Sequence, residues 1–342
     1  QYVLKDKKGR VTKVEGRRFV SRHNVHRMAI ELFVTPVNYD GIIEAENIID
    51  GTIVNFYDAP RFKVKHMYLT ANETLGEHGV YIESATRDRH LHVGTGCVLE
   101  AYKDGRPVMR NRMFHAFGEQ AVEFGDFPVT EGETVRLVKY VSMYTERECP
   151  AYALHTTIKE EVDHFMEDGL ETELRFHGNV YDAMWEEADV CFEGDPELNR
   201  AVRFNIFHLM STGNETDDRV SVGAKLLTGE EYGGHAFWDI ELFMLPFFSY
   251  VFPKMAQNME NYRYYLLDAA RENAKKNGYK GAQYPWESAD DGTEQCPDWT
   301  IEPDGTCYRC YVAMYEHHVT ADVAYGIYDY VRITKDLDFL YG

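Results

Sequence analysis

The sequence predicts an α+β multidomain protein with an antiparallel β-sandwich at its N-terminus and helices after it. Short β-like runs separated by turn pairs fill the first part of the chain, with no helical pattern between them. Further along, apolar residues recur at helical spacing, and long helices alternate with loops rich in Gly, Pro, Trp and Asp. We therefore expect a β-sandwich over 1–150, a helical linker over 151–194 and, over 195–342, the first helices of an α/α barrel.

The predicted strands are β-branched and aromatic runs that end at Gly, Pro or Asp-Gly. The first of them stops at Pro36, because proline cannot donate a hydrogen bond to a strand ladder. Asp-Gly pairs, as at 40–41, predict tight turns between antiparallel neighbours. Strands are expected over 28–36, 41–51, 79–84, 91–94 and 135–144.

The helices are predicted from their start and stop signals. One begins at Asp195, whose carboxylate can cap the first turn, with Pro196 at the first helical position. Another begins at Pro253 and stops near Gly278, and a third begins at about Thr320. Glycines at 169 and 178 are expected to break the helical linker. The inward residues are expected to be Leu198, Val202, Ile206 and Leu209 in the first helix, and Met255, Met259, Leu266 and Ala270 in the second.

The charge balance excludes several classes of partner. Lys and Arg number 36 against 57 Asp and Glu, which gives a net charge of −21. An acidic surface repels the phosphates of nucleic acid and of anionic membranes, so we expect neither as a partner. The opening residues do not resemble a signal peptide, and the sequence contains no run of 18 apolar residues, so we expect neither a secretory signal nor a membrane span. Its six cysteines are too sparse for a disulfide scaffold, which favours a reducing cytoplasm.

Three of the cysteines raise the question of a metal site. Cys307 and Cys310 form a C-x-x-C pair, and Cys296 lies upstream. A zinc knuckle needs a fourth ligand at a matching spacing, and only His317 and His318 lie near. We expect no metal and interpret these residues as reduced structural thiols.

Two loops bounded by glycines each place a tryptophan beside a carboxylate: Trp238 with Asp239, and Trp286 with Glu287. A tryptophan ring packs on the apolar face of a pyranose, and a carboxylate accepts strong hydrogen bonds from adjacent hydroxyls. The residues therefore indicate a sugar site. The structural alternative is that Asp239 caps an apolar helix and that Trp286 anchors a solvated acidic loop.

A third stretch carries ionisable side chains where the third helix begins. Glu316, His317 and His318 could act in acid–base chemistry or bind a metal. Their spacing is not that of a zinc protease helix. Asp322, in the first helical turn, is explained by the helix dipole.

Several of these segments resemble glycoside hydrolase family 65, which includes maltose, trehalose, kojibiose and nigerose phosphorylases. The resemblance rests on residues 227–230 (LTGE), 234–246 (GHAFWDIELFMLP), 285–290 (PWESAD) and 318–325 (HVTADVAY), in that order. Residues 18–21 (RFVS) look like a strand of the family's sandwich domain. The resemblance implies an N-terminal β-sandwich, a helical linker and an (α/α)6 barrel.

The resemblance also implies an activity, that of a glycosyltransferase-type disaccharide phosphorylase. In this family a glutamic acid protonates the glycosidic oxygen while inorganic phosphate, the co-substrate, attacks the anomeric carbon. The products are β-glucose 1-phosphate and a sugar acceptor, and no cofactor is needed. By resemblance, Trp238 and Asp239 hold the glucose before the cleaved bond, and Trp286 and Glu287 line the cleft nearby. A homodimer is implied as well.

The sequence departs from the family pattern in two places. The general acid of the family lies in a downstream motif that is absent here, so we expect no catalytic residue within the chain and an acid beyond Gly342. A twelve-helix barrel needs on the order of 300 residues, so we expect an incomplete barrel and a sandwich incomplete at its N-terminus. Residues 297–314 do not match the acceptor patterns of maltose or trehalose enzymes, which leaves the acceptor sugar and the cleaved linkage open.

Two alternatives to the phosphorylase remain. A hydrolase of the same or a related α/α-barrel family would use a carboxylate base in place of phosphate. A non-catalytic sugar-binding module would use the tryptophan and carboxylate residues without a general acid.

Overall fold

The computed structural model describes residues 1–56, 63–226, 231–301 and 304–341. The chain forms two compact units. Unit 1 comprises Gln1–Val54 and Lys65–Ala183, and unit 2 comprises Asn55–Val64 and Met184–Gly342.

Unit 1 contains two antiparallel sheets. The large sheet has the strand order β1-β2-β3-β13-β9-β8-β7, with β10 paired to β9, and the small sheet has the order β11-β12-β4. The predicted sandwich is thereby confirmed. Its strands are β1 (Tyr2–Lys5), β2 (Val11–Val20), β3 (Arg27–Pro36), β4 (Gly41–Asp50), β7 (Met67–Thr74), β8 (Val80–Thr86), β9 (His92–Lys103), β10 (Arg106–Pro107), β11 (Arg110–Phe117), β12 (Gln120–Val129) and β13 (Val135–Thr145).

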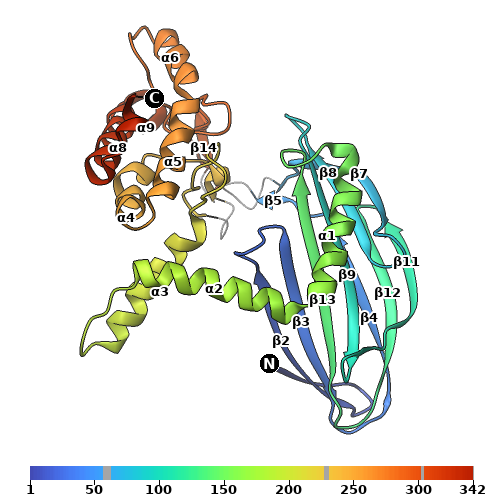
Figure 1. Ribbon diagram of the computed structural model, residues 1–342. Coiled ribbons are helices and arrows are strands. Elements are labelled where there is room, and N and C mark those ends of the chain that lie inside the picture. Colours follow the sequence, from blue (N-terminus) through green and yellow to red (C-terminus); the bar gives the residue numbers. More distant parts are fainter. Residues whose placement is uncertain (57–62, 227–230, 302–303, 342) are drawn as a thin grey trace. The chain divides into compact units, whose positions relative to one another are not determined.

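The central strands of the large sheet are covered on both faces, whereas the edge strands β1 and β2 are largely exposed. One face packs on the small sheet through clusters that include Phe127, Leu137 and Ile82. The other face is covered by α1 (Leu154–Asp168), which lies on β13 and β9 in Figure 1. Ile158 and Phe165 of α1 belong to a cluster with buried residues of the sheet. The predicted linker helix α1 is therefore a third layer of unit 1.

Unit 2 is helical, as predicted from residue 195 onward. Helices begin where they are predicted, at Pro196, at Pro253 and close to Thr320, but the single helix expected from Pro253 to Gly278 is divided at Leu266, where the backbone leaves the helical region (φ −94°, ψ 5°). Helix α8 packs against the segment Ile240–Met244 and against α4 and α5. Helix α2 (Leu170–Ala188) begins in unit 1 and ends in unit 2. The helices that follow it are α3 (Pro196–Thr212), α4 (Leu245–Val251), α5 (Pro253–Tyr265), α6 (Leu267–Lys276), α7 (Val312–Tyr315), α8 (Val319–Thr334) and α9 (Leu337–Tyr341), and the short strand pairs of unit 2 are β5 (Asn55–Phe56) with β6 (Lys63–Val64) and β14 (Trp299–Ile301) with β15 (Cys307–Arg309).

Two further details of the helix predictions are wrong. Gly178 does not break the linker, because α2 continues through it, whereas Gly169 does end α1 with a positive φ of 79°. Leu198 does not face inward: it is 41% exposed, and Met210 is fully buried instead. The inward residues expected after Pro253 are confirmed, since Met255, Met259, Leu266 and Ala270 are all buried.

Replacement of Asp195 by alanine is expected to lower the free energy of unfolding of unit 2 by about 1 kcal/mol. The Asp195 carboxylate accepts a hydrogen bond from the Leu198 amide at 2.9 Å, and alanine leaves that amide without its partner. Denaturation followed by tryptophan fluorescence reports on unit 2, because the four tryptophans of the chain lie at 185, 238, 286 and 299. Asp195→Asn keeps the acceptor and should remain within a few tenths of a kcal/mol of the parent.

Within the part of the chain that is described, none of the helices combines the length and the apolar composition needed to cross a membrane.

Candidate functional site

The two tryptophan loops predicted to bind sugar lie side by side in unit 2. Ala236 and Ser288 form an antiparallel bridge, with N–H···O distances of 2.9 Å and 3.0 Å between their backbones. Trp238 lies two residues after one end of this bridge, and Trp286 lies two residues before the other. Their ring centroids are 6.5 Å apart, with the planes inclined at 49°. The structure thus brings together two aromatic residues that are far apart in sequence.

His318 completes this aromatic group from the residue before α8. Its ring meets Trp238 edge-on at 4.8 Å and Trp286 edge-on at 5.8 Å. Its Nδ1 lies 2.5 Å from Oδ2 of Asp322, one helical turn on, which fixes the orientation of the ring. The sequence marks His318 as an acid–base or metal candidate, and the structure places its ring against both tryptophans. We call Trp238, Trp286 and His318 the aromatic cluster.

Asp239 is exposed, at the start of a wide turn over Ile240–Met244. Its backbone is already helical (φ −53°, ψ −30°), and its side chain makes no capping hydrogen bond. The interpretation of Asp239 as a helix cap is therefore wrong. The turn closes a π-type hydrogen bond from the Leu245 amide to the Ile240 carbonyl, and single π-turns of this kind are frequent at functional sites.

Glu287 differs from Asp239, because it is only 4% exposed. Its Oε1 lies 2.7 Å from Nδ1 of His235, which belongs to the other tryptophan loop. The carboxylate of Glu294 accepts hydrogen bonds from the amides of Trp286 at 2.7 Å and Glu287 at 3.1 Å. Glu287 therefore ties the two loops together, with its carboxylate turned toward His235.

Arg263 of α5 is a buried residue that holds the loop carrying Trp238 and Asp239. It is fully buried, and its guanidinium donates to the Glu241 carboxylate at 2.5 Å and 3.1 Å. It also donates to the Phe237 carbonyl at 3.1 Å, directly before Trp238. Paired and buried in this way, Arg263 fixes the backbone that carries Trp238 and Asp239.

The same helix holds the second loop. The hydroxyl of Tyr262 donates to the Ala289 carbonyl at 2.9 Å and lies 2.8 Å from the Ser288 hydroxyl. The Arg263 carbonyl accepts a hydrogen bond from the Tyr284 hydroxyl at 2.9 Å. Sequence reasoning missed Tyr262 and Arg263. The available signal was an arginine between Met259 and Leu266, on a helix stripe that is otherwise apolar.

Glu260 is buried next to this ion pair. Burial, together with the nearby charge of Glu241, raises the pKa of Glu260 well above its ordinary value, although Arg263 acts in the opposite direction. Its Oε2 has no hydrogen-bond partner among the described residues. The protonated acid is therefore the form that the fold favours.

Stability is expected to depend on pH through Glu260. Because the pKa is higher in the folded protein than in the unfolded chain, the folded protein binds the proton more tightly. This stabilisation is complete below the ordinary glutamate pKa and is lost as the pH rises through the folded value. Glu260→Gln should flatten this part of the pH–stability curve of unit 2, measured by denaturation at a series of pH values. An unchanged slope would contradict the raised pKa.

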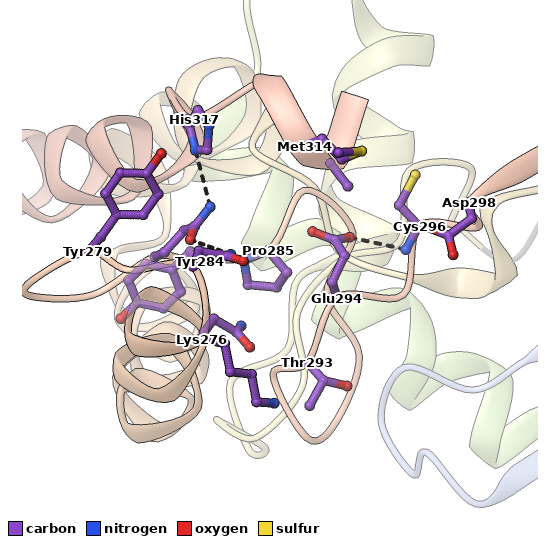
Figure 2. Close-up of a pocket in the computed structure, with 14 residues that line it drawn as sticks. Lys276, Tyr279, Tyr284, Pro285, Thr293, Glu294, Cys296, Asp298, Met314 and His317 are labelled. Carbon is purple, nitrogen blue, oxygen red and sulfur yellow. Dashed lines mark hydrogen bonds between the residues drawn. The ribbon is translucent and has the colours of Figure 1, made fainter. Parts of the chain in front are cut away.

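A cavity of about 530 Å³ opens beside the second tryptophan loop (Figure 2). Pro285 and Glu294 of that loop contribute to its lining, whereas Trp238, Asp239, Trp286 and Glu287 do not. The four predicted sugar residues therefore lie outside this cavity. Its lining consists of Asn273, Lys276, Asn277, Tyr279, Gln283, Tyr284, Pro285, Thr293, Glu294, Cys296, Asp298, Ala313, Met314 and His317.

The remaining sequence predictions concern metals and the first signature segment. Among the residues with described positions, no group of three or more His, Cys, Asp or Glu side chains is placed to hold a metal ion. Residues 227–230, which carry the LTGE part of the resemblance, lie outside the described residues.

Comparison with known proteins gives consistent matches along the whole chain. The family model for the glycosyl hydrolase family 65 N-terminal domain matches residues 1–184, and that for the family 65 central catalytic domain matches residues 203–342. A kojibiose phosphorylase of Thermoanaerobacter brockii is 46% identical over 99% of this chain and 44% of its own length. An alpha,alpha-trehalose phosphorylase of the same organism is 32% identical over 97% of this chain and 42% of its own length.

A solved structure from the human microbiome shares the fold. It superposes with a TM-score of 0.80 over 98% of this chain and 41% of its own, at 18% sequence identity. The chain thus spans less than half the length of each of these proteins.

Proposed function

The chain belongs to glycosyl hydrolase family 65, and from this premise we propose that the intact protein catalyses the inverting phosphorolysis of an α-linked glucose disaccharide. The products are β-glucose 1-phosphate and a free sugar. The similarity to kojibiose and trehalose phosphorylases supports disaccharide phosphorolysis as the reaction.

The observation that carries the proposal is the aromatic cluster with Asp239 beside it. Trp238 and Trp286 offer two inclined rings 6.5 Å apart, with the edge of His318 against both. Such rings fit the C–H faces of a pyranose. The exposed Asp239 carboxylate is free to accept hydrogen bonds from two adjacent hydroxyls, and these bonds are strong because the acceptor is charged. We assign Trp238 and Asp239 to the glucose that is transferred.

Glu287 has an indirect role in this proposal, because it positions the loops that carry the two tryptophans. One of its oxygens is held by His235, so it orients the two loops and lines the floor of the sugar site. Neither Asp239 nor Glu287 is assigned a proton-transfer role. The general acid that protonates the glycosidic oxygen is expected in the family's downstream motif.

The reaction needs no carboxylate base in this mechanism. Phosphate is itself a nucleophile, whereas an inverting hydrolase needs a base to activate water. As the general acid protonates the leaving oxygen, the glycosidic bond breaks and the anomeric carbon bonds to phosphate with inversion. Phosphate is the co-substrate, and no cofactor is required.

Phosphate dependence is the experiment that separates the candidate functions. The intact protein is assayed with kojibiose, nigerose, maltose and trehalose, with and without inorganic phosphate, and the sugar products are identified. We expect β-glucose 1-phosphate to form from at least one disaccharide, and only when phosphate is present. Release of glucose at the same rate without phosphate would establish a hydrolase, and sugar binding without turnover would establish a binding module.

The working form that we propose is a homodimer in a reducing cytoplasm. Family membership supports the dimer, and the six cysteines, all of them free thiols, support the compartment. Sedimentation of the intact protein at several concentrations tests the oligomeric state.

A further inference from the structure

Cys296 and Cys310 place their thiols side by side. The two Sγ atoms are 3.6 Å apart, and both residues are half-buried. Cys310 directly follows β15, where its amide donates to the Asp298 carbonyl at 2.8 Å and extends the β14–β15 ladder. A disulfide has a sulfur–sulfur length of about 2 Å, so an approach of about 1.6 Å would join the two thiols.

The strand geometry decides which cysteines can pair. Successive side chains of a strand point to opposite faces. Cys307 and Arg309 therefore lie on one face of β15, and Tyr308 and the next residue in the series, Cys310, lie on the opposite face. The C-x-x-C pair is therefore split between two faces, and the exposed Cys307 cannot reach Cys310 while the hairpin is intact. Cys296, which lies outside the C-x-x-C motif, is the neighbour of Cys310.

The cysteine pair is joined to the sugar-binding loop by one carboxylate. Oε1 of Glu294 accepts hydrogen bonds from the amides of Cys296 at 3.0 Å and of Glu287 at 3.1 Å, and Oε2 accepts one from the Trp286 amide at 2.7 Å. Figure 2 shows the hydrogen bond between Cys296 and Glu294, both of which line the 530 Å³ cavity. The cavity exposes Cys296 to a small molecule, and Cys310, which does not line the cavity, is only half-buried beside it.

We propose that Cys296 and Cys310 form a redox modification site that a low-molecular-weight disulfide such as oxidised glutathione converts into an intramolecular disulfide. The Cys310 thiolate attacks one sulfur of the small disulfide and releases one thiolate, which gives a mixed disulfide. Cys296 then loses its proton, attacks the Cys310 sulfur and releases the second thiolate. Two protein thiols lose two electrons in total, and one small disulfide is reduced to two thiols.

The order of these steps follows from the surroundings of Cys296. Burial, with the neighbouring Cys310 thiol, raises the pKa of Cys296 to about 12, so it is a poor first nucleophile at neutral pH. Its attack in the second step is intramolecular, and proximity compensates for its low thiolate fraction.

Closure of the disulfide would also move the sugar site, a consequence that rests on the proposed function. When Cys296 shifts toward Cys310, its amide pulls on the Glu294 carboxylate. The same carboxylate accepts hydrogen bonds from the amides of Trp286 and Glu287, so these two residues move with it. Displacement of a substrate-positioning loop by about an ångström can lower activity up to about a hundredfold. We therefore expect the oxidised protein to lose about tenfold or more in kcat/KM, and a thiol reductant to restore it.

Disulfide mapping tests the site without reference to activity. The reduced intact protein is equilibrated with glutathione buffers of increasing oxidised fraction, alkylated, and digested with trypsin and a protease that cleaves before aspartate. Cleavage before Asp298 and Asp304 separates the peptide of Cys296 from that of Cys307, and trypsin separates Cys307 from Cys310 after Arg309, so mass spectrometry distinguishes the two possible partners of Cys310. We expect a Cys296–Cys310 cross-link, abolished in Cys310→Ser and retained in the matched control Cys307→Ser. A Cys307–Cys310 cross-link, or full alkylation of Cys296 in every buffer, would overturn the proposal.

The coupling to the sugar site has its own measurement. Tryptophan fluorescence and kcat/KM are recorded for the oxidised and reduced parent protein and for Cys310→Ser in the same buffers. We expect both signals to respond to oxidation in the parent and neither in Cys310→Ser. If the cross-link forms and the fluorescence responds but no phosphorolysis occurs in either state, the proposed function fails and the redox site stands.

Discussion

Replacement of Arg263 by methionine is expected to lower the free energy of unfolding of unit 2 by about 3–5 kcal/mol. The substitution keeps a side chain of similar length, but it leaves the Glu241 carboxylate in the interior without its cation, next to the protonated Glu260. The Glu241 side chain is almost fully buried, so its charge cannot be solvated without local unfolding. Denaturation followed by tryptophan fluorescence measures the loss.

A matched control is Arg271→Met on α6. Arg271 also pairs with a carboxylate, that of Asp268 at 2.7 Å, but both side chains are exposed. Loss of an exposed pair should cost no more than about 1 kcal/mol. The double variant Arg263→Met with Glu241→Met should recover part of the stability, since removal of both buried charges is cheaper than removal of one. If the Arg263 and Arg271 variants lost the same free energy of unfolding, the buried ion pair would contribute no more to stability than the exposed one.

Replacement of Asp239 by alanine should lower kcat/KM for phosphorolysis by about a hundredfold to ten-thousandfold. In the proposed site its carboxylate accepts two charge-assisted hydrogen bonds from the glucose, each with a contribution of about 1.5–3 kcal/mol, and a tenfold loss in rate corresponds to about 1.4 kcal/mol. Stability should change little, because the side chain is exposed and caps no helix. Kinetics of the intact protein, together with its denaturation curve, measure the two effects separately.

Asp239→Asn and Asp268→Ala are the controls for this result. Asparagine keeps one neutral acceptor and should fall between the parent and alanine in kcat/KM. Asp268 is an exposed helical aspartate that forms an ion pair only with Arg271 among the described contacts, and its replacement should leave the kinetics unchanged. Turnover of Asp239→Ala near that of the parent would remove Asp239 from the sugar site.

The sequence predicted most elements whose signals are local. The cap at Asp195 and the start at Pro253 fall where the structure has them, because capping and proline geometry depend on a few neighbouring residues. Strands β3, β4, β8 and β13 were found, but β2 and β12 were not predicted as complete strands. β2 is rich in charged residues, so its own sequence does not indicate a strand. It forms because its backbone hydrogen-bonds to the neighbouring strand β3, and this pairing is a long-range contact.

The candidate site was predicted only in part, because its residue types are a local signal but their arrangement depends on contacts between distant segments. Trp238 and Trp286 stood out as residue types, but their approach depends on the bridge between Ala236 and Ser288, which is a long-range pairing. The roles of Asp239 and Glu287 looked equivalent in the sequence. The structure distinguishes them, since Asp239 is exposed and Glu287 is bound to His235. The support from Tyr262 and Arg263 depends on packing between helix α5 and the two loops, for which the local sequence carries little signal.

The wide turn at Ile240–Met244 has a consequence for insertions and deletions in this protein. A π-turn contains one residue more than the α-helical turn that could replace it. Deletion of a single residue there would rotate Asp239 by about 100° around the axis relative to the buried Leu245 and Phe248. The carboxylate would then point elsewhere, so the length of this five-residue segment constrains the site as well as the identity of its side chains.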